Sequence, residues 1–153
     1  MTETEHLLAI EAIRMVKTRY WRGVDLGDGA LVRSILAADC ELDFRGCCTD
    51  PASGTDFLPV MNVVMRGRDS WKADALSQIV SAHHGHQSEI TIQGPDTASA
   101  IWAFTDRMWM PQGSPFALLE GHGFYHDSYV READGWKLRT SRITRLKVEV
   151  EVR

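Results

Sequence analysis

The side chains best suited to acid–base chemistry gather in residues 81–110, which read SAHHGHQSEITI, Gln93, a Gly-Pro-Asp turn and TASAIWAFTDRMWM. His83 lies near the start of the first run, and Asp106 stands among apolar residues in the second. Burying a carboxylate in such surroundings is costly unless it has a partner. Paired antiparallel strands bring distant positions side by side. We therefore predict that His83 and Asp106 meet across a hairpin.

In this pair Asp106 would accept a hydrogen bond from one imidazole nitrogen, fix the tautomer and raise the basicity of the other nitrogen, which makes His83 a general base. Two structural readings remain open beside it. The pair could be a hydrogen-bonded element of the fold, or Asp106 could form a surface ion pair with Arg107.

The other histidines of the central region raise the question of a metal centre, since imidazole binds zinc and iron. Neighbours on a strand point to opposite faces, and no Cys or Glu falls at the usual ligand spacing. We expect no metal site, and we interpret these residues as surface or interface histidines: His84, His86, His122 and His126.

Helical spacing of apolar residues predicts a first helix over residues 5–23, which Gly27 and Gly29 end. Asp28 can cap a second helix through residues 31–36. We also predict a third helix over residues 66–80.

The remaining segments read as strands and loops. A short strand is expected at residues 40–44, followed by a loop at 45–60 that contains Cys47 and Cys48. Long strands are expected at 82–93, 97–110 and 117–132, and a tight turn at Asp134-Gly135 leads into a fourth at 136–150. Helices followed by an antiparallel meander predict an α+β fold with helices on one face of the sheet.

Composition narrows the function classes. At 153 residues the chain forms one domain, residues 1–153. Its net charge of −4, without a basic run, argues against nucleic acid. No apolar window reaches the roughly 18 residues of a membrane span, and the acidic, amphipathic N-terminus is unlike a signal peptide. Three cysteines, two of them adjacent, form no disulfide framework. We expect a cytoplasmic protein.

The expected strand 97–110 is apolar on both of its faces: Trp102 and Phe104 share one, Ile101 and Ala103 the other. One-sided antiparallel sheets normally alternate. We therefore expect that helices cover one face and a second copy of the chain covers the other, which makes the protein a homo-oligomer.

Four segments together resemble a known family: IEAIRMVKTRYWRGVD, SAHHGHQSEITI, DTASAIWAFTDRMW and GFYHDSYVREADG. In order and spacing they are similar to the SnoaL-like group of the nuclear-transport-factor-2-like superfamily, which includes scytalone dehydratase and, with the closer match, bacterial bile-acid 7α-dehydratase. The resemblance covers residues 9–150 and implies a cone-shaped, curved antiparallel sheet packed against N-terminal helices. It also favours a trimer over a dimer.

The resemblance implies a catalytic set on this chain: Tyr20, Asp25, His83, Asp106 and Arg145. Read without the family, Tyr20 is equally a core aromatic and Asp25 a cap of the next helix. Strand parity groups Arg142, rather than Arg145, with Leu138; a β-bulge would reconcile the two readings. Substrate contacts are expected from inward-facing residues of the central strands: Trp102, Phe104, Met108, Tyr125 and Asp127. Met108, Tyr125 and Asp127 depart from the scytalone dehydratase pattern, which argues against scytalone as substrate.

The implied activity is that of a dehydratase, a lyase without cofactor that acts on a hydroxylated, largely apolar ring compound of steroid or polyketide type. An isomerase like the ketosteroid isomerases is the first alternative, and its base would fall near Asp43 or Phe44. A small-molecule-binding protein without catalysis is the second, because one fold serves many functions.

Overall fold

The computed structural model describes residues 1–72 and 78–153. Its first helix, α1, spans Glu3–Leu26. Thr2 and Glu5 form a capping box at its start, and Gly27, in the left-handed conformation with φ of 65°, ends it. The second helix, α2, spans Gly29–Ile35, and the Asp28 side chain accepts a hydrogen bond from the Leu31 amide at its start. Both predicted helices and the capping role of Asp28 are thus confirmed.

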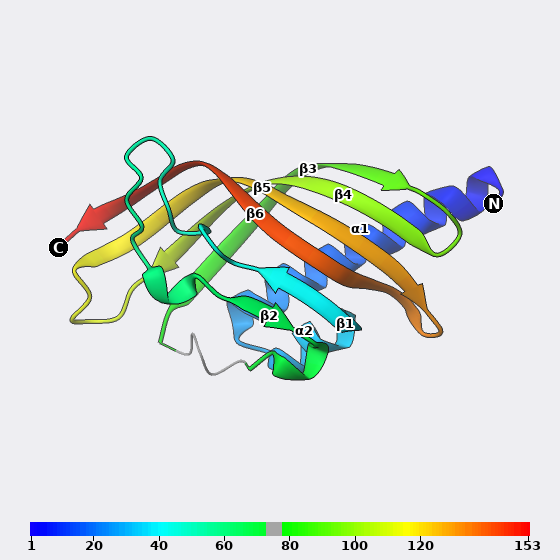
Figure 1. Ribbon diagram of the computed structural model, residues 1–153, viewed down its shortest axis with the longest axis horizontal. Helices are drawn as coiled ribbons and strands as arrows, with labels where there is room; N and C mark the ends of the chain where they lie inside the picture. Colours follow the sequence, from blue (N-terminus) through cyan, green and yellow to red (C-terminus); the bar gives the residue numbers. More distant parts are fainter. Residues whose placement is uncertain (73–77) are drawn as a thin grey trace.

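A six-stranded sheet in the order β2-β1-β6-β5-β4-β3 forms the rest of the fold (Figure 1). Its strands are β1 (Leu36–Asp43), β2 (Val64–Arg66), β3 (Val80–Ile92), β4 (Thr97–Trp109), β5 (Phe116–Glu132) and β6 (Gly135–Val152). Strands β3 to β6 form the predicted antiparallel meander. Strand β1 pairs in parallel with β6, so the sheet is mixed. The long strands curve strongly, and α1 runs along one face of them, in contact with β3 and β6.

The core lies between α1 and this inner face of the sheet. Alternate residues of β4 and β5 are buried, whereas the residues between them are more exposed. The helix contributes an apolar stripe that includes Ile13, Val16 and Tyr20. This arrangement confirms the predicted α+β class and the curved sheet packed on N-terminal helices.

The helix predicted over residues 66–80 is wrong where the structure describes that segment. Arg66 ends β2, Arg68–Ser70 is a single 3₁₀ turn, and Val80 already begins β3. Residues 73–77 of this prediction lie outside the described part of the chain. Apolar spacing in so short a segment does not separate a helix from a strand and turn. A 3₁₀ turn, Pro59–Met61, also interrupts the expected loop 45–60.

Among the described residues, no helix has the length and apolar character needed to cross a membrane.

Candidate active site

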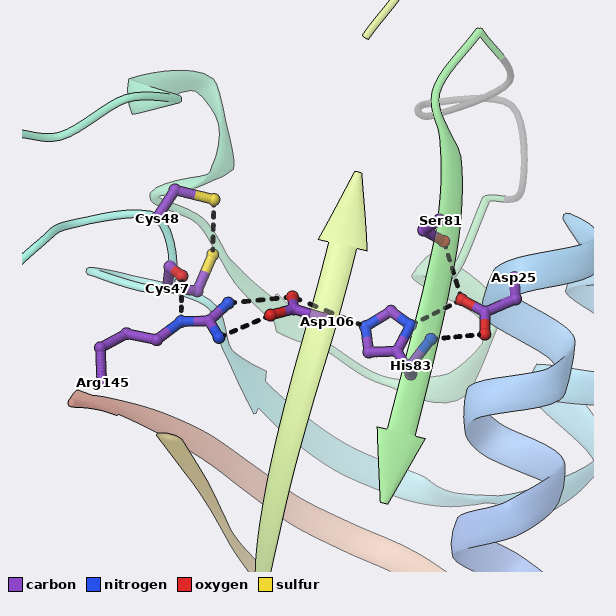
Figure 2. Close-up of polar contacts among 7 residues, drawn as sticks. All are labelled: Asp25, Cys47, Cys48, Ser81, His83, Asp106 and Arg145. Atoms are coloured by element: carbon purple, nitrogen blue, oxygen red, sulfur yellow. Dashed lines mark hydrogen bonds and ion pairs between the residues drawn. The ribbon is translucent and has the colours of Figure 1, made fainter. Parts of the chain in front are cut away.

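Asp25 and His83 form a closely connected polar pair on the inner side of the sheet (Figure 2). His83 Nδ1 lies 2.6 Å from Asp25 Oδ1, and the His83 backbone N–H donates to Asp25 Oδ2 at 2.8 Å. The Ser81 hydroxyl donates to Oδ1 at 2.8 Å. Burial alone would raise the pKa of Asp25, but these bonds lower the pKa below its ordinary value. An ionised Asp25 requires a hydrogen on Nδ1, so neutral His83 has its lone pair on Nε2.

This geometry corrects the predicted role of Asp106 as the residue that orients the imidazole. Asp106 lies opposite His83 across the β3–β4 pairing, as predicted. Its carboxylate is nevertheless 4.0 Å from His83 Nε2, beyond hydrogen-bonding distance. The imidazole is held from its other side by Asp25, which α1 supplies from its last turn. Sequence spacing within the hairpin could not reveal a partner that comes from a different element.

Asp106 is bound instead by Arg145. The guanidinium donates from Nη1 and Nη2 to the two carboxylate oxygens at 2.7 and 3.0 Å, and both side chains are almost fully buried. Burial disfavours the guanidinium charge, but Asp106 outweighs this effect and raises the pKa of Arg145. A two-bond Arg–carboxylate pair is strong and fixed in orientation. The alternative reading of an Asp106–Arg107 pair is wrong, because Arg107 Nε donates to Glu120.

A bulge in β6 explains why parity misplaced the arginines. His122 pairs with Lys147 while the next residue, Gly123, pairs with Arg145, so Leu146 is the extra residue. The shift turns Arg145 inward. Arg142 pairs with His126 and remains exposed. The bulge confirms Arg145, and not Arg142, as the inward-facing arginine.

Gly121 makes room for the buried ion pair. A Cβ at this position would lie 2.3 Å from Arg145 Nη1 and 2.5 Å from Asp106 Oδ1, closer than such atoms can approach. Gly85 has a similar relation to Trp21, whose ring carbon would be 2.1 Å from a Cβ. Glycine at these inward positions of β3 and β5 therefore leaves the space that Trp21, Asp106 and Arg145 occupy.

Aromatic side chains continue the site into the core. The His83 and Phe104 rings are nearly parallel, with an angle of 16° and centroids 6.4 Å apart, and the Tyr125 centroid is 4.4 Å from that of Phe104. Tyr20 packs edge-on against Tyr125 at 6.2 Å and is 2 % exposed. Burial, and then the charge of Asp127, raises the pKa of Tyr20 far above its ordinary value, so its phenol stays protonated. Tyr20 thus lies within the aromatic layer that adjoins His83.

A second buried polar cluster includes Lys17, which sequence reasoning missed. Its Nζ lies 2.8 Å from Asp127 Oδ2 and 3.5 Å from the centroid of the Tyr125 ring. Tyr129 and Ser141 hydroxyls donate to the two oxygens of Asp127. Burial lowers the pKa of Lys17 to about 8, against the opposing effect of Asp127. The sequence did carry one sign of this cluster, because Lys17 interrupts the apolar stripe of α1.

The remaining predicted contacts also line the interior. Trp102 donates from Nε1 to the Tyr129 hydroxyl at 3.1 Å, and Met108 is buried on β4, two residues after Asp106. Asp127, expected as a substrate contact, has its carboxylate engaged by the cluster around Lys17.

Three other positions considered from the sequence lie away from this interior. Asp43, the position near which an isomerase base was expected, is bound by Arg45 at 2.7 and 2.9 Å, and this bond lowers its pKa to about 2. His84 is exposed. His122 has ligand atoms within 4.8 Å of those of Glu120 and Glu149, but Glu120 already pairs with Arg107.

The outer face of the sheet carries a separate hollow of about 410 Å³, lined by residues of β3, β4, β5 and β6 that include Glu89, Ile101 and His126. It is on the side opposite to the His83 side chain, so it does not belong to the acid–base site.

Comparison with known proteins places this chain in a family. Residues 5–142 match the model of the SnoaL-like domain. A scytalone dehydratase candidate from Novosphingobium aromaticivorans is similar in structure, with a TM-score of 0.77, 16 % identity, and 99 % of this chain and 94 % of that chain covered. A LinA-type3 hexachlorocyclohexane dehydrochlorinase from Novosphingobium barchaimii gives a TM-score of 0.74 at 15 % identity, with 97 % and 94 % covered.

A dehydratase candidate of the NTF2-like family from Streptomyces avermitilis gives a TM-score of 0.70 at 14 % identity, with 91 % of this chain and 97 % of that chain covered. At these identities the structural matches establish the fold. The family match, over most of its length, shows that this chain belongs to the SnoaL-like domain family.

Proposed function

We propose that the protein is a lyase that removes water from a hydroxylated, largely apolar ring compound of steroid or polyketide type. The observation that carries the proposal is the His83 imidazole, which Asp25 holds through Nδ1 at 2.6 Å while Nε2 faces the interior beside Asp106. A fixed imidazole with a free nitrogen, nearly buried and stacked beside Phe104, is suited to removing a carbon-bound proton.

In this mechanism His83 Nε2 takes a proton that a neighbouring carbonyl of the substrate has acidified. The imidazolium that forms lies between two carboxylates, Asp25 on the Nδ1 side and Asp106 on the Nε2 side, and their charges favour it. Arg145 holds the Asp106 carboxylate in place through two hydrogen bonds, and so fixes its position relative to Nε2. The same imidazolium can return the proton to the departing hydroxyl, which leaves as water.

Protonated Tyr20 would donate to the enolate oxygen as negative charge develops there, in the manner of an oxyanion hole. Phe104 and Tyr125 would supply the apolar wall against which the ring packs. These side chains provide every proton transfer that the reaction needs, so we propose that it requires no cofactor.

One observation favours dehydration over the isomerase alternative. An isomerase of the ketosteroid type would use a base near Asp43, and here the Asp43 carboxylate is committed to Arg45 at the protein surface. The names of the similar structures, two dehydratase candidates and a dehydrochlorinase, also describe eliminations.

The test is turnover of a panel of hydroxylated ketones and enones from the steroid and polyketide classes, in the presence of a chelator, with product mass as readout. Loss of one water from any member supports the lyase. A product of unchanged mass supports the isomerase. Tight binding without either reaction supports the non-catalytic alternative and contradicts the proposal.

A further inference from the structure

Cys47 and Cys48 form a pair of neighbouring thiols beside the acid–base site. They lie in the turn that follows β1, and their sulfur atoms are 3.7 Å apart (Figure 2). Both are free and buried, at 3 % and 2 % exposure. The mechanism proposed above uses neither thiol.

The backbone of Cys47 is bonded to the site. Its carbonyl accepts a hydrogen bond from Arg145 Nε at 2.6 Å, while the other two guanidinium nitrogens bind Asp106. Asp106 in turn lies 4.0 Å from His83 Nε2. Figure 2 shows this chain of contacts from the thiols to the imidazole. A movement of the Cys47 peptide therefore acts directly on the orientation of Arg145.

The two thiols differ in acidity. The bond from Cys48 and the positive charge of Arg145 lower the pKa of Cys47 despite its burial. The pKa of Cys48 is raised, first by its bond to Cys47 and then by burial. An acidic thiol next to one that keeps its proton is the arrangement of a sulfur nucleophile and its resolving partner.

We propose that Cys47 and Cys48 are a redox-sensitive dithiol, which a small hydroperoxide converts to a disulfide, and that this disulfide displaces Arg145 from its present position. The Cys47 thiolate attacks the peroxide oxygen, the O–O bond breaks, and Cys47 becomes a sulfenic acid while water or an alcohol leaves. The Cys48 sulfur then attacks the Cys47 sulfur, the S–S bond forms, and the hydroxyl leaves as water. Two thiols are oxidised and one peroxide is reduced.

The disulfide would be easily reversed. Neighbouring Cα atoms are about 3.8 Å apart across a trans peptide, whereas disulfides usually span about 4.4–6.8 Å. A bond between adjacent cysteines is therefore strained, and strained disulfides are the readily reduced ones. The strain must be taken up by the turn, which includes the Cys47 carbonyl that Arg145 binds.

The effect on catalysis rests on the proposed function, but formation of the disulfide does not. The test treats the full chain with hydrogen peroxide and follows trypsin peptides by mass spectrometry, together with melting temperature and turnover. Cleavage after Arg45 and Arg66 gives a peptide with Cys47 and Cys48 but without Cys40, the third cysteine. Matched variants are Cys48→Ser, which keeps the Cys47 carbonyl, and Cys40→Ser.

In the unchanged protein and in Cys40→Ser, we expect peroxide to remove two hydrogen atoms from this peptide. The melting temperature of the treated protein should fall by about 3 °C or more, and its turnover by about tenfold or more. Dithiothreitol should restore all three. Cys48→Ser should keep its untreated activity and show no disulfide and no shift that dithiothreitol reverses. If no substrate has been found, the peptide mass still shows whether the disulfide forms, and the melting temperature shows whether it disturbs the fold. A peptide that keeps both thiols overturns the proposal, and a disulfide without change in melting temperature overturns the coupling to Arg145.

Discussion

His83 contacts Asp25 through Nδ1 at 2.6 Å, and this bond joins the last turn of α1 to the start of β3. The Asp25 carboxylate also accepts from the backbone of the residue whose ring it orients. Ring and main chain are thus held by one group, which leaves the imidazole little freedom to rotate. This constraint is the basis of the proposed base and of the predictions below.

Gly121→Ala should disrupt the buried ion pair. The added methyl group would overlap Arg145 Nη1 and Asp106 Oδ1, so these side chains must shift. We expect the free energy of unfolding to fall by about 1–3 kcal/mol and turnover to fall with it. Gly94→Ala is the matched control, because its Cβ would meet Thr97 Oγ1 at an ordinary 3.4 Å. Equal stability and activity in the two variants would show that Asp106 and Arg145 can shift without effect on folding or turnover.

Arg145→Met should destabilise the fold strongly, because it leaves the buried Asp106 carboxylate without its cation. Breaking such a pair costs about 3–5 kcal/mol, which urea denaturation measures. Arg142→Met removes an exposed arginine from the same strand and should change stability by no more than about 0.5 kcal/mol. Replacing Asp106 by Asn together with Arg145→Met should recover part of the loss. Similar urea midpoints for the two single variants would contradict the buried pair.

Lys17 should make stability depend on pH above neutrality. Its pKa is about 8 in the folded protein and 10.5 when solvated, so between these values the unfolded chain binds more protons. The Lys17 contribution to the free energy of unfolding therefore rises with pH from about 8, by roughly 3 kcal/mol in total. Since tyrosines and thiols titrate in the same range, the quantity to measure is the difference between the unchanged protein and Lys17→Met.

That difference should grow in favour of the unchanged protein from about pH 8 to 10. Lys147→Met, which removes an exposed lysine of β6, should give a difference that stays flat over the same range. A flat profile for Lys17→Met as well would mean that Lys17 titrates normally.

We also propose that the protein is a homo-oligomer that assembles through the outer face of its sheet. Ile101 and Trp109 are exposed there, and the hollow of about 410 Å³ lies on the same face. Light scattering should give a mass that is a multiple of the monomer, and Ile101→Asp should lower it. A stable monomer at micromolar concentration would remove this proposal.

The sequence predicted elements whose pattern is local. The periodicity of α1 and the Asp28 cap were sufficient for the first two helices, and extended runs separated by turn residues were sufficient for the meander. The pairing of His83 with Asp106 across the hairpin followed from the turn between their strands. The third helix is wrong at residues 66–72 and 78–80, where the end of β2, a 3₁₀ turn and the start of β3 follow one another.

Spacing and periodicity could not predict the contacts between distant elements, and the family resemblance placed Asp25, Asp106 and Arg145 in one site without giving their pairing. Asp25 meets His83 only because α1 crosses the sheet at β3, and Arg145 meets Asp106 only because β6 carries a bulge. Lys17 was overlooked because a lysine on an amphipathic helix is normally solvated, and its partner Asp127 lies on β5. Each of these relations depends on packing that no single segment encodes.

The most direct test of the account is the turnover number of Asp25→Asn, measured per folded molecule on a substrate that the protein dehydrates. The asparagine keeps the shape of the side chain but removes the charge that fixes the Nδ1 hydrogen and stabilises the imidazolium. We predict that kcat falls by about 10²–10⁴-fold, that His83→Ala falls at least as far, and that the double variant is little worse than either. Asp28→Asn, an exposed cap residue, should leave kcat unchanged. A lowered melting temperature for Asp25→Asn with kcat preserved would contradict the account, because Asp25 and His83 would then serve the fold and not the reaction.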